Sequence, residues 1–174
     1  MFLTDMVISE SRSDDEPDFD GTFRAHYTSM VRSLGLACGD AEVAADAVQD
    51  AFTRAYARWS RISGYEDPVA WIRHVALNRV RDHYRHASRG RRAFDRIAHR
   101  DRTDVAPPEL PPESPGVAAA LAALPRQQRT AAALFYVEQL SVREVATSMK
   151  LSEGAVKYHL HAARAALREK VSLP

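Results

Sequence analysis

Polar side chains near the C-terminus share one face of a predicted helix, and their types suit contact with DNA. Counting about 100° per residue from Val156 places an apolar stripe that includes Leu160 on one side of this helix. A helix that exposes donors, acceptors and positive charge on its other side is suited to a major groove. The face opposite the stripe carries Tyr158, His161, Ala165 and Arg168, with Lys157 flanking it.

The element that must position this face is a pair of short helices joined by a tight turn, over residues 141–168. Ser141 and Glu144 form an S-x-x-E capping box, which marks the start of the first helix. Ser152 has the position of a second N-cap. The sequence therefore predicts a helix-turn-helix. The apolar stripe of its first helix consists of Val142, Val145, Ala146 and Met149.

A second candidate face lies on the predicted helix that opens with Pro68 at its first position. Asn78 offers the paired donor and acceptor that a base edge requires, and Arg81 and Arg85 can neutralise phosphates. The alternative is a charged helix surface with Trp71 half buried against a neighbouring helix. The full non-core face contains Trp71, His74, Asn78, Arg81, Asp82 and Arg85, opposite the expected core residues Val69, Ile72, Val75, Ala76 and Val80.

Charge and composition limit the class of protein. The formal net charge is +1, but residues 1–18 hold six acidic residues and one Arg, whereas residues 141–170 hold six basic and three acidic ones. The single Cys38 excludes an intramolecular disulfide and suits a reducing compartment. The sequence has no run of 18 apolar residues and no basic segment at its start. We therefore expect a soluble cytoplasmic protein with no membrane span and no signal peptide.

The histidines do not form a convincing metal or catalytic site. His83 and His86 lie three apart and His159 and His161 two apart, but no Cys or carboxylate completes a tetrahedral set. Neither a nucleophile–base pair nor a glycine-rich phosphate loop is recognisable. We expect no metal, no cofactor and no enzymatic activity.

The chain divides into two helical parts. Residues 1–18 are acidic and without period, which predicts a disordered tail. Five prolines between 107 and 115 exclude a helix and favour an extended connector. The prediction is an all-α fold of two small domains, 19–86 and 117–174, joined by a flexible linker over 87–116.

Three segments together resemble a bacterial family. DAVQDAF at 46–52 is similar to the core-binding segment of sigma domain 2, and DPVAWIRHVALNRVRDHYR at 67–85 is similar to its promoter −10 segment. ALAALPRQQRTAAALFYVEQLSVREVA at 120–146, followed by the helix-turn-helix, resembles sigma domain 4. The chain resembles an extracytoplasmic-function (ECF, group 4) sigma factor of RNA polymerase, over roughly residues 19–86 and 117–170.

The resemblance gives the acidic helix face at 46–50 a role. In the family this face docks on the clamp helices of the polymerase largest subunit. Fixed carboxylates opposite basic helices speed and orient such docking. A solvated face that only keeps the domain soluble is the alternative. The residues concerned are Asp46, Gln49 and Asp50.

The resemblance also implies reading and opening of the −10 element. Family members contact this element with an Asn at the position of Asn78, and Asp82 has the position of a second contact residue. The family places a pocket for an unstacked base at the loop 60–67, where Arg61 and Tyr65 offer a charge and a stacking ring. Packing of Tyr65 against the helices is the alternative.

In sigma domain 4 the resemblance assigns −35 reading to the last helix. The reading positions are Lys157, Tyr158, His161 and Ala162, with Arg164 and Arg168 as phosphate contacts. Three residues depart from the family pattern, namely Lys150 in place of a turn Gly, Ala155 in place of Thr and Ala162 in place of Arg. A left-handed backbone at Lys150 costs roughly 1 kcal/mol. The −35 sequence preference therefore cannot be inherited.

The implied partners are core RNA polymerase, through its clamp and flap, and promoter DNA, with the chain a monomer when bound to polymerase. An anti-sigma factor is a further possible partner, and the acidic tail is a candidate mask for the DNA-reading surfaces. Two other hypotheses are a helix-turn-helix regulator without sigma activity and a sigma-like decoy that binds polymerase but opens no promoter.

Overall fold

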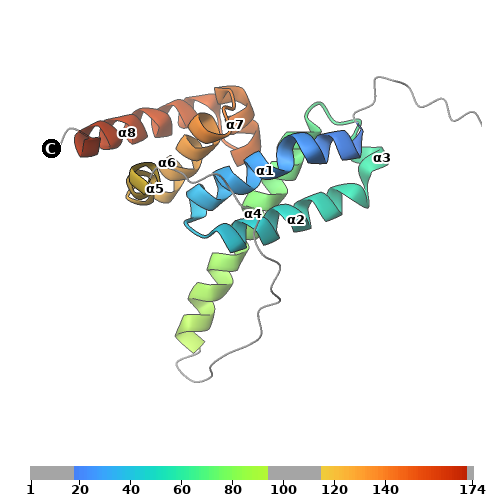
Figure 1. Ribbon diagram of the computed structural model, residues 1–174, viewed down its shortest axis with the longest axis horizontal. Helices are drawn as coiled ribbons and strands as arrows, with labels where there is room; N and C mark the ends of the chain where they lie inside the picture. Colours follow the sequence, from blue (N-terminus) through green and yellow to red (C-terminus); the bar gives the residue numbers. More distant parts are fainter. Residues whose placement is uncertain (1–17, 94–114, 172–174) are drawn as a thin grey trace, which may run out of the picture.

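The computed structural model describes residues 18–93 and 115–171, and every regular element in these ranges is a helix. Residues 1–17 of the predicted tail (1–18) and residues 94–114 of the predicted linker (87–116) lie outside the described residues. The helices form two units that lie side by side in Figure 1, which we call the first unit (α1–α4) and the second unit (α5–α8 with η1).

The first unit is built on locally encoded helix ends. The carboxylate of Asp18 accepts a hydrogen bond from the Gly21 N–H at 3.1 Å, and that of Asp40 accepts from the N–H groups of the residues two and three positions on. Gly39, at φ 79°, takes the left-handed conformation that ends the first helix. The elements are α1 (Phe19–Cys38), α2 (Ala41–Tyr56), α3 (Trp59–Ile62) and α4 (Pro68–Ala93).

Apolar stripes on α1, α2 and α4 meet in the core of the first unit. Phe52 of α2 is fully buried and contacts the rings of Phe19, Phe23 and Tyr27 on α1, with centroids 5.1–6.2 Å apart. On α4 the predicted core residues Ile72, Ala76 and Val80 are buried, whereas Val69 and Val75 are only partly buried.

The second unit contains the predicted helix-turn-helix. Ser141 and Glu144 form the expected capping box, and the Ser152 hydroxyl accepts a hydrogen bond from the Ala155 N–H at 3.1 Å. Lys150 adopts the left-handed conformation, at φ 56° and ψ 46°, that glycine favours at this turn. The elements are α5 (Pro115–Ala122), α6 (Arg126–Ala132), η1 (Ala133–Val137), α7 (Val142–Met149) and α8 (Glu153–Val171).

Three local features differ from the sequence prediction. The predicted loop 60–67 begins with the last three residues of the short helix α3, and α4 continues seven residues past 86, to Ala93. The chain after α6 forms a π-helical turn, η1, which the all-α prediction did not specify. In Figure 1 the last turns of α4 project away from both units.

The two units pack directly against each other. Helix α1 lies along α5, α6 and η1, while α4 contacts α7 of the helix-turn-helix. One apolar cluster runs through both units and includes Met30 and Leu34 of α1 together with Leu134, Val145 and Met149. The predicted domains therefore share a core, whereas the proline-rich segment between them predicted two separate ones.

Candidate nucleic-acid interface

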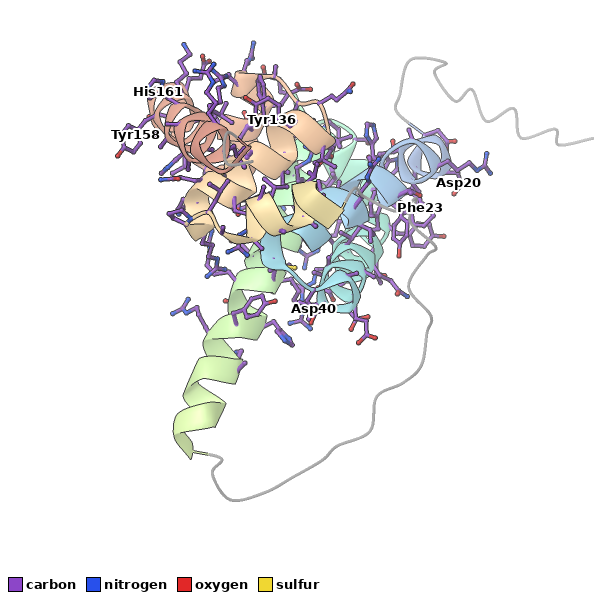
Figure 2. The ribbon with its side chains drawn as sticks, turned by 60° about the vertical axis from the view of Figure 1, so that its left-hand side comes forward. Asp20, Phe23, Asp40, Tyr136, Tyr158 and His161 are labelled. Carbon is purple, nitrogen blue, oxygen red and sulfur yellow. The ribbon has the colours of Figure 1, made fainter. Side chains whose placement is uncertain are left out.

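The outer face of α8 presents most of its predicted reading residues to solvent. Val156, Leu160 and Ala163 are buried on the inner side of this helix. Tyr158 is 67% exposed, and Lys157 and His161 are also exposed. Figure 2 shows Tyr158 and His161 on the side of α8 that faces away from the first unit. The predicted −35 face is therefore open for contact.

The remaining predicted −35 residues lie at the edges of that face. Ala162 is half-buried. The Arg164 guanidinium donates a hydrogen bond from Nε to the Tyr136 hydroxyl at 2.6 Å. Arg164 and Arg168 also border an apolar groove between α5, η1 and α8, whose other lining residues include Val117, Leu121 and Leu167. These two arginines thus stand where the polar face meets apolar surface.

The predicted −10 residues on α4 are divided between solvent and the second unit. Arg81, Asp82 and Arg85 are exposed, and the last two form an ion pair at 3.9 Å. His74 instead faces α7, where its Nδ1 donates to the Ser148 carbonyl oxygen at 3.0 Å. With the proton on Nδ1, Nε2 accepts the 2.9 Å hydrogen bond from the Asn78 amide. One neutral tautomer of His74 satisfies both contacts.

The loop before α4 lies beside the second unit as well. Arg61 is exposed, and Tyr65 is 36% exposed with its ring edge-on to the half-buried Trp71 at 6.5 Å. The Tyr65 side chain is thus partly packed against Trp71 and partly exposed to solvent. The Glu66 carboxylate pairs with Arg143 of α7 at 2.6 Å. Between the loop, α4 and α7 lies a hollow of about 550 Å³.

The predicted polymerase-docking residues share one surface of α2. Asp46 and Gln49 are exposed. Asp50 is half-buried and pairs with Arg54 at 2.9 Å and with Arg79 of α4 at 3.5 Å. Asp46, Asp50 and Arg79 line a shallow groove between α2 and α4. The surface is therefore acidic at its centre with two arginines holding one carboxylate in place.

A buried polar network crosses between the units, and sequence reasoning missed it. Arg73 of α4 is 2% exposed and pairs with Glu138, which follows η1. Ser33 and Ser148 complete the network. The sequence held one signal: Arg73 precedes Ala76 and Val80 by three and seven residues, so it falls within a buried stripe. A charge in such a stripe implies a buried partner.

Two titratable groups near this network have shifted pKa values. Burial, and next the positive charge of Arg73, lower the pKa of His26 below its ordinary 6.5 despite the opposing carboxylates of Glu138, Asp67 and Glu144. Hydrogen bonds from the Ser141 hydroxyl and backbone N–H lower the pKa of Glu144.

Two other kinds of feature are absent from the part of the chain that the structure describes. Within 18–93 and 115–171 no group of three His, Cys, Asp or Glu side chains is arranged to hold a metal ion. In the same part of the chain, no helix is both long enough and apolar enough to cross a membrane.

Comparison with known proteins identifies the class first. Residues 22–90 match the Sigma-70 region 2 family, and residues 116–167 match Sigma-70, region 4. The two regions cover the first unit and the helix-turn-helix unit respectively, which defines a protein of the sigma-70 class.

Full-length relatives then give the family. The ECF RNA polymerase sigma factor SigF of Caulobacter vibrioides is 31% identical over 152 residues, which span 85% of this chain and 78% of that protein. The RNA polymerase sigma-E factor of Streptomyces coelicolor is 29% identical over 166 residues, 88% of this chain and 86% of that protein. The chain belongs to the family of ECF RNA polymerase sigma factors.

A solved structure supports the fold. The sigma factor RpoE from Bartonella quintana, in complex with the anti-sigma factor NepR, superposes with a TM-score of 0.69 at 20% identity. The match covers 90% of this chain and 98% of that one.

Proposed function

We propose that this chain binds core RNA polymerase and directs it to promoters, with the first unit reading and opening the −10 element and the second unit reading the −35 element. The observation that carries the proposal is the presence of both sigma-70 regions in one chain, each with a polar helix face. A helix-turn-helix regulator without sigma activity would have no need of region 2.

The −35 contact is assigned to the exposed face of α8. Tyr158 and His161 offer hydrogen bonds to base edges in the major groove, and Lys157 supplies a positive charge. Arg168 and Arg164 are placed at the edge of this face, where phosphates would pass. Ala162 contributes no charge, so readout at its position falls to its neighbours.

The −10 contact is assigned to α4 and the loop before it. Asn78 is the base-reading residue, because its amide offers both a donor and an acceptor. Arg81 and Arg85 lie on the exposed part of the same helix and suit phosphates. His74, Trp71 and Tyr65 line the hollow in which we place an unstacked base. Arg61, exposed on α3 shortly before the loop, is assigned a supporting charge.

Docking on polymerase is assigned to the α2 surface that carries Asp46, Gln49 and Asp50. The ion pairs of Asp50 hold its carboxylate in a fixed position, as electrostatic docking against basic helices requires. Initiation is the role of this chain in the cytoplasm, and the polymerase performs the phosphoryl chemistry. Since the similar RpoE was solved with an anti-sigma factor, we include such a regulator among the proposed partners.

Run-off transcription tests the proposal. Purified core polymerase and this protein, on fragmented DNA from the source genome, should yield discrete transcripts. Asn78→Ala should remove most of them, because loss of a bidentate base contact costs about 1–3 kcal/mol. His83→Ala, at an exposed position of α4, serves as the control and should leave transcription intact.

The outcomes separate the alternatives. Polymerase binding without transcripts would indicate a decoy. Failure to bind polymerase at all would refute sigma activity and leave a helix-turn-helix regulator. Unchanged transcripts with Asn78→Ala would remove that residue from promoter reading without refuting the rest.

A further inference from the structure

Within the α4 face that we assign to −10 reading, His74 lies against the second unit in this structure, whereas Arg81 and Arg85 are exposed. The His74 ring donates a hydrogen bond to the Ser148 carbonyl oxygen of α7 and accepts one from the Asn78 amide. The loop residue Glu66 is paired with Arg143 of the same helix. Both ring nitrogens of His74 are therefore engaged in this arrangement, and so is the amide nitrogen of Asn78.

This arrangement is incompatible with simultaneous contact to two promoter elements. The −10 and −35 elements lie about two helical turns apart, on the order of 70 Å. In the structure the helix-turn-helix and the α4 face are within hydrogen-bonding distance, at 3.0 Å between His74 Nδ1 and Ser148 O. A chain that acts as we propose must therefore separate its two units before or during promoter binding.

The contact between the two units contains a network of buried hydrogen bonds around one ion pair. Glu138 Oε1 accepts from Arg73 Nε at 2.9 Å and from Nη2 at 2.6 Å, and Oε2 accepts from the Ser33 hydroxyl at 2.8 Å. Arg73 Nη1 donates to the Ser148 hydroxyl at 3.2 Å. The Arg73 and Glu138 side chains are each only 3% exposed. Every one of these bonds joins the first unit to the second.

The backbone on both sides of Glu138 departs from regular helix geometry. The π-helical turn η1 ends at Val137, and Gln139 then adopts φ 59°, a left-handed conformation that is costly for a non-glycine residue. Glu138 lies between these two irregularities. Strained backbone of this kind persists where the surrounding structure over-determines it and is typical of switch regions.

We propose that Glu138 is a latch that holds the free chain closed, with Arg73, Ser33 and Ser148 as its receptor, and that the second unit in this closed state covers the part of the −10-reading face of α4 around His74. The proposal rests on the proposed sigma function, because it names a regulation of that same site. The partner that covers the face is thus another part of this chain.

The chemistry of the latch suits reversible closure. The apolar cluster with Met30, Leu34 and Leu134 supplies attraction between the units but little directional control. The ion pair fixes the register, because any other alignment would bury Arg73 or Glu138 without its partner. On opening, both charged groups return to water, which offsets much of the loss of their mutual attraction. Closure is therefore sensitive to either charge.

The interdomain distance measures this directly. Spin labels at Ala57→Cys, beyond α2, and Ala123→Cys, between α5 and α6, place one exposed probe on each unit of the full chain with Cys38→Ser. Pulsed electron–electron double resonance on the free protein should give one narrow distance distribution at short distance. Glu138→Gln keeps the size of the side chain but leaves Arg73 facing a neutral amide. This variant should shift most molecules to longer and broader distances.

Two further variants grade the effect. Ser33→Ala removes one of the three bonds to Glu138 and should give a mixture of short and long distances. Arg143→Gln is the matched control, because it breaks an ion pair that also crosses between the units but is 75% and 85% exposed on its two sides. It should leave the short distance unchanged. Circular dichroism must show equal helix content in all variants, so that opening is not confused with unfolding.

A functional measurement completes the test. If only open molecules bind, the apparent dissociation constant scales inversely with the open fraction. Glu138→Gln should therefore bind core polymerase and promoter DNA about tenfold more tightly if the open fraction rises about tenfold. Addition of polymerase and promoter to the wild-type chain should abolish the short distance.

An unchanged distance in Glu138→Gln would overturn the latch whether or not transcripts are made, as would a short distance that persists in the polymerase–promoter complex. A short distance that Glu138→Gln abolishes, in a chain that yields no transcripts, would uphold the latch and refute the sigma function.

Discussion

At the scale of single residues, the side chains that we propose to read DNA and those that join the two units lie next to each other on α4. Arg73 and His74 are sequence neighbours, yet Arg73 is buried against Glu138 while His74 contacts the α7 backbone. Their environment is therefore set by which surface covers α4. A change at His74 would alter both the packing between the units and the proposed promoter contact, and a change at Arg73 could disturb its neighbour His74. Glu138, which lies outside the proposed reading face, is therefore the better site for mutation.

The stability of the fold should depend on pH through protonation of His26, which lies near the contact between the two units. Burial and the charge of Arg73 lower its pKa below 6.5, so the unfolded chain binds the proton more tightly than the folded one. Stability should accordingly be complete above pH 6.5 and be lost as the pH falls through the lower, folded-state pKa. Urea unfolding followed between about pH 7 and 5 measures the effect.

His26→Gln should flatten this dependence, whereas His86→Gln, at an exposed position of α4, should not. The pKa of Glu144 is also lowered, so the stability that this residue contributes is lost in a separate pH range, below its ordinary pKa of 4.5. A wild-type stability that does not change across the histidine window would contradict the burial of His26.

At the scale of helices, the sequence predicted the ends whose signals are local and missed those that depend on distant contacts. The caps at Ser141 and Ser152 each require only side-chain and backbone groups three residues apart, and both are present. The π-helical turn η1 has no such local signal. Its residue Leu134 is buried in the cluster that spans both units, so its form depends on packing that periodicity does not describe.

The turn of the helix-turn-helix allows a direct test at this scale. Lys150 holds φ 56°, which costs a side-chain-bearing residue roughly 1 kcal/mol relative to glycine. Lys150→Gly should therefore raise the free energy of unfolding by about 0.5–1 kcal/mol, after allowance for the greater freedom of glycine in the unfolded chain. Ala165→Gly, inside α8 and exposed, is the control and should lower it by about 1 kcal/mol.

Chemical denaturation of the three proteins under one condition decides the matter. A destabilising effect of Lys150→Gly would mean that the backbone at this turn is not left-handed in solution.

At the scale of the whole molecule, the division into two helical units followed from composition, but their packing did not. Prolines between 107 and 115 indicated a connector and hence two independent units. The buried pairing of Arg73 with Glu138 joins residues 65 positions apart, and no periodic pattern encodes such a pair. The candidate reading residues were predicted by type and face, whereas the division of the α4 face between solvent and α7 needed the tertiary structure.

Long-range charge is the remaining property that belongs to the whole molecule, and the acidic surface of α2 provides the test. Asp46→Lys combined with Asp50→Lys should slow association with core polymerase at low salt by about tenfold or more, because complementary potentials steer encounter before contact. Stopped-flow association at several salt concentrations measures the rate, and its salt dependence should decrease in the variant.

Asp20→Lys combined with Glu42→Lys makes the same change in net charge on exposed positions of the first unit. If this control slowed association equally, net charge rather than the α2 surface would govern docking, and the assignment of Asp46 and Asp50 to the polymerase interface would fail.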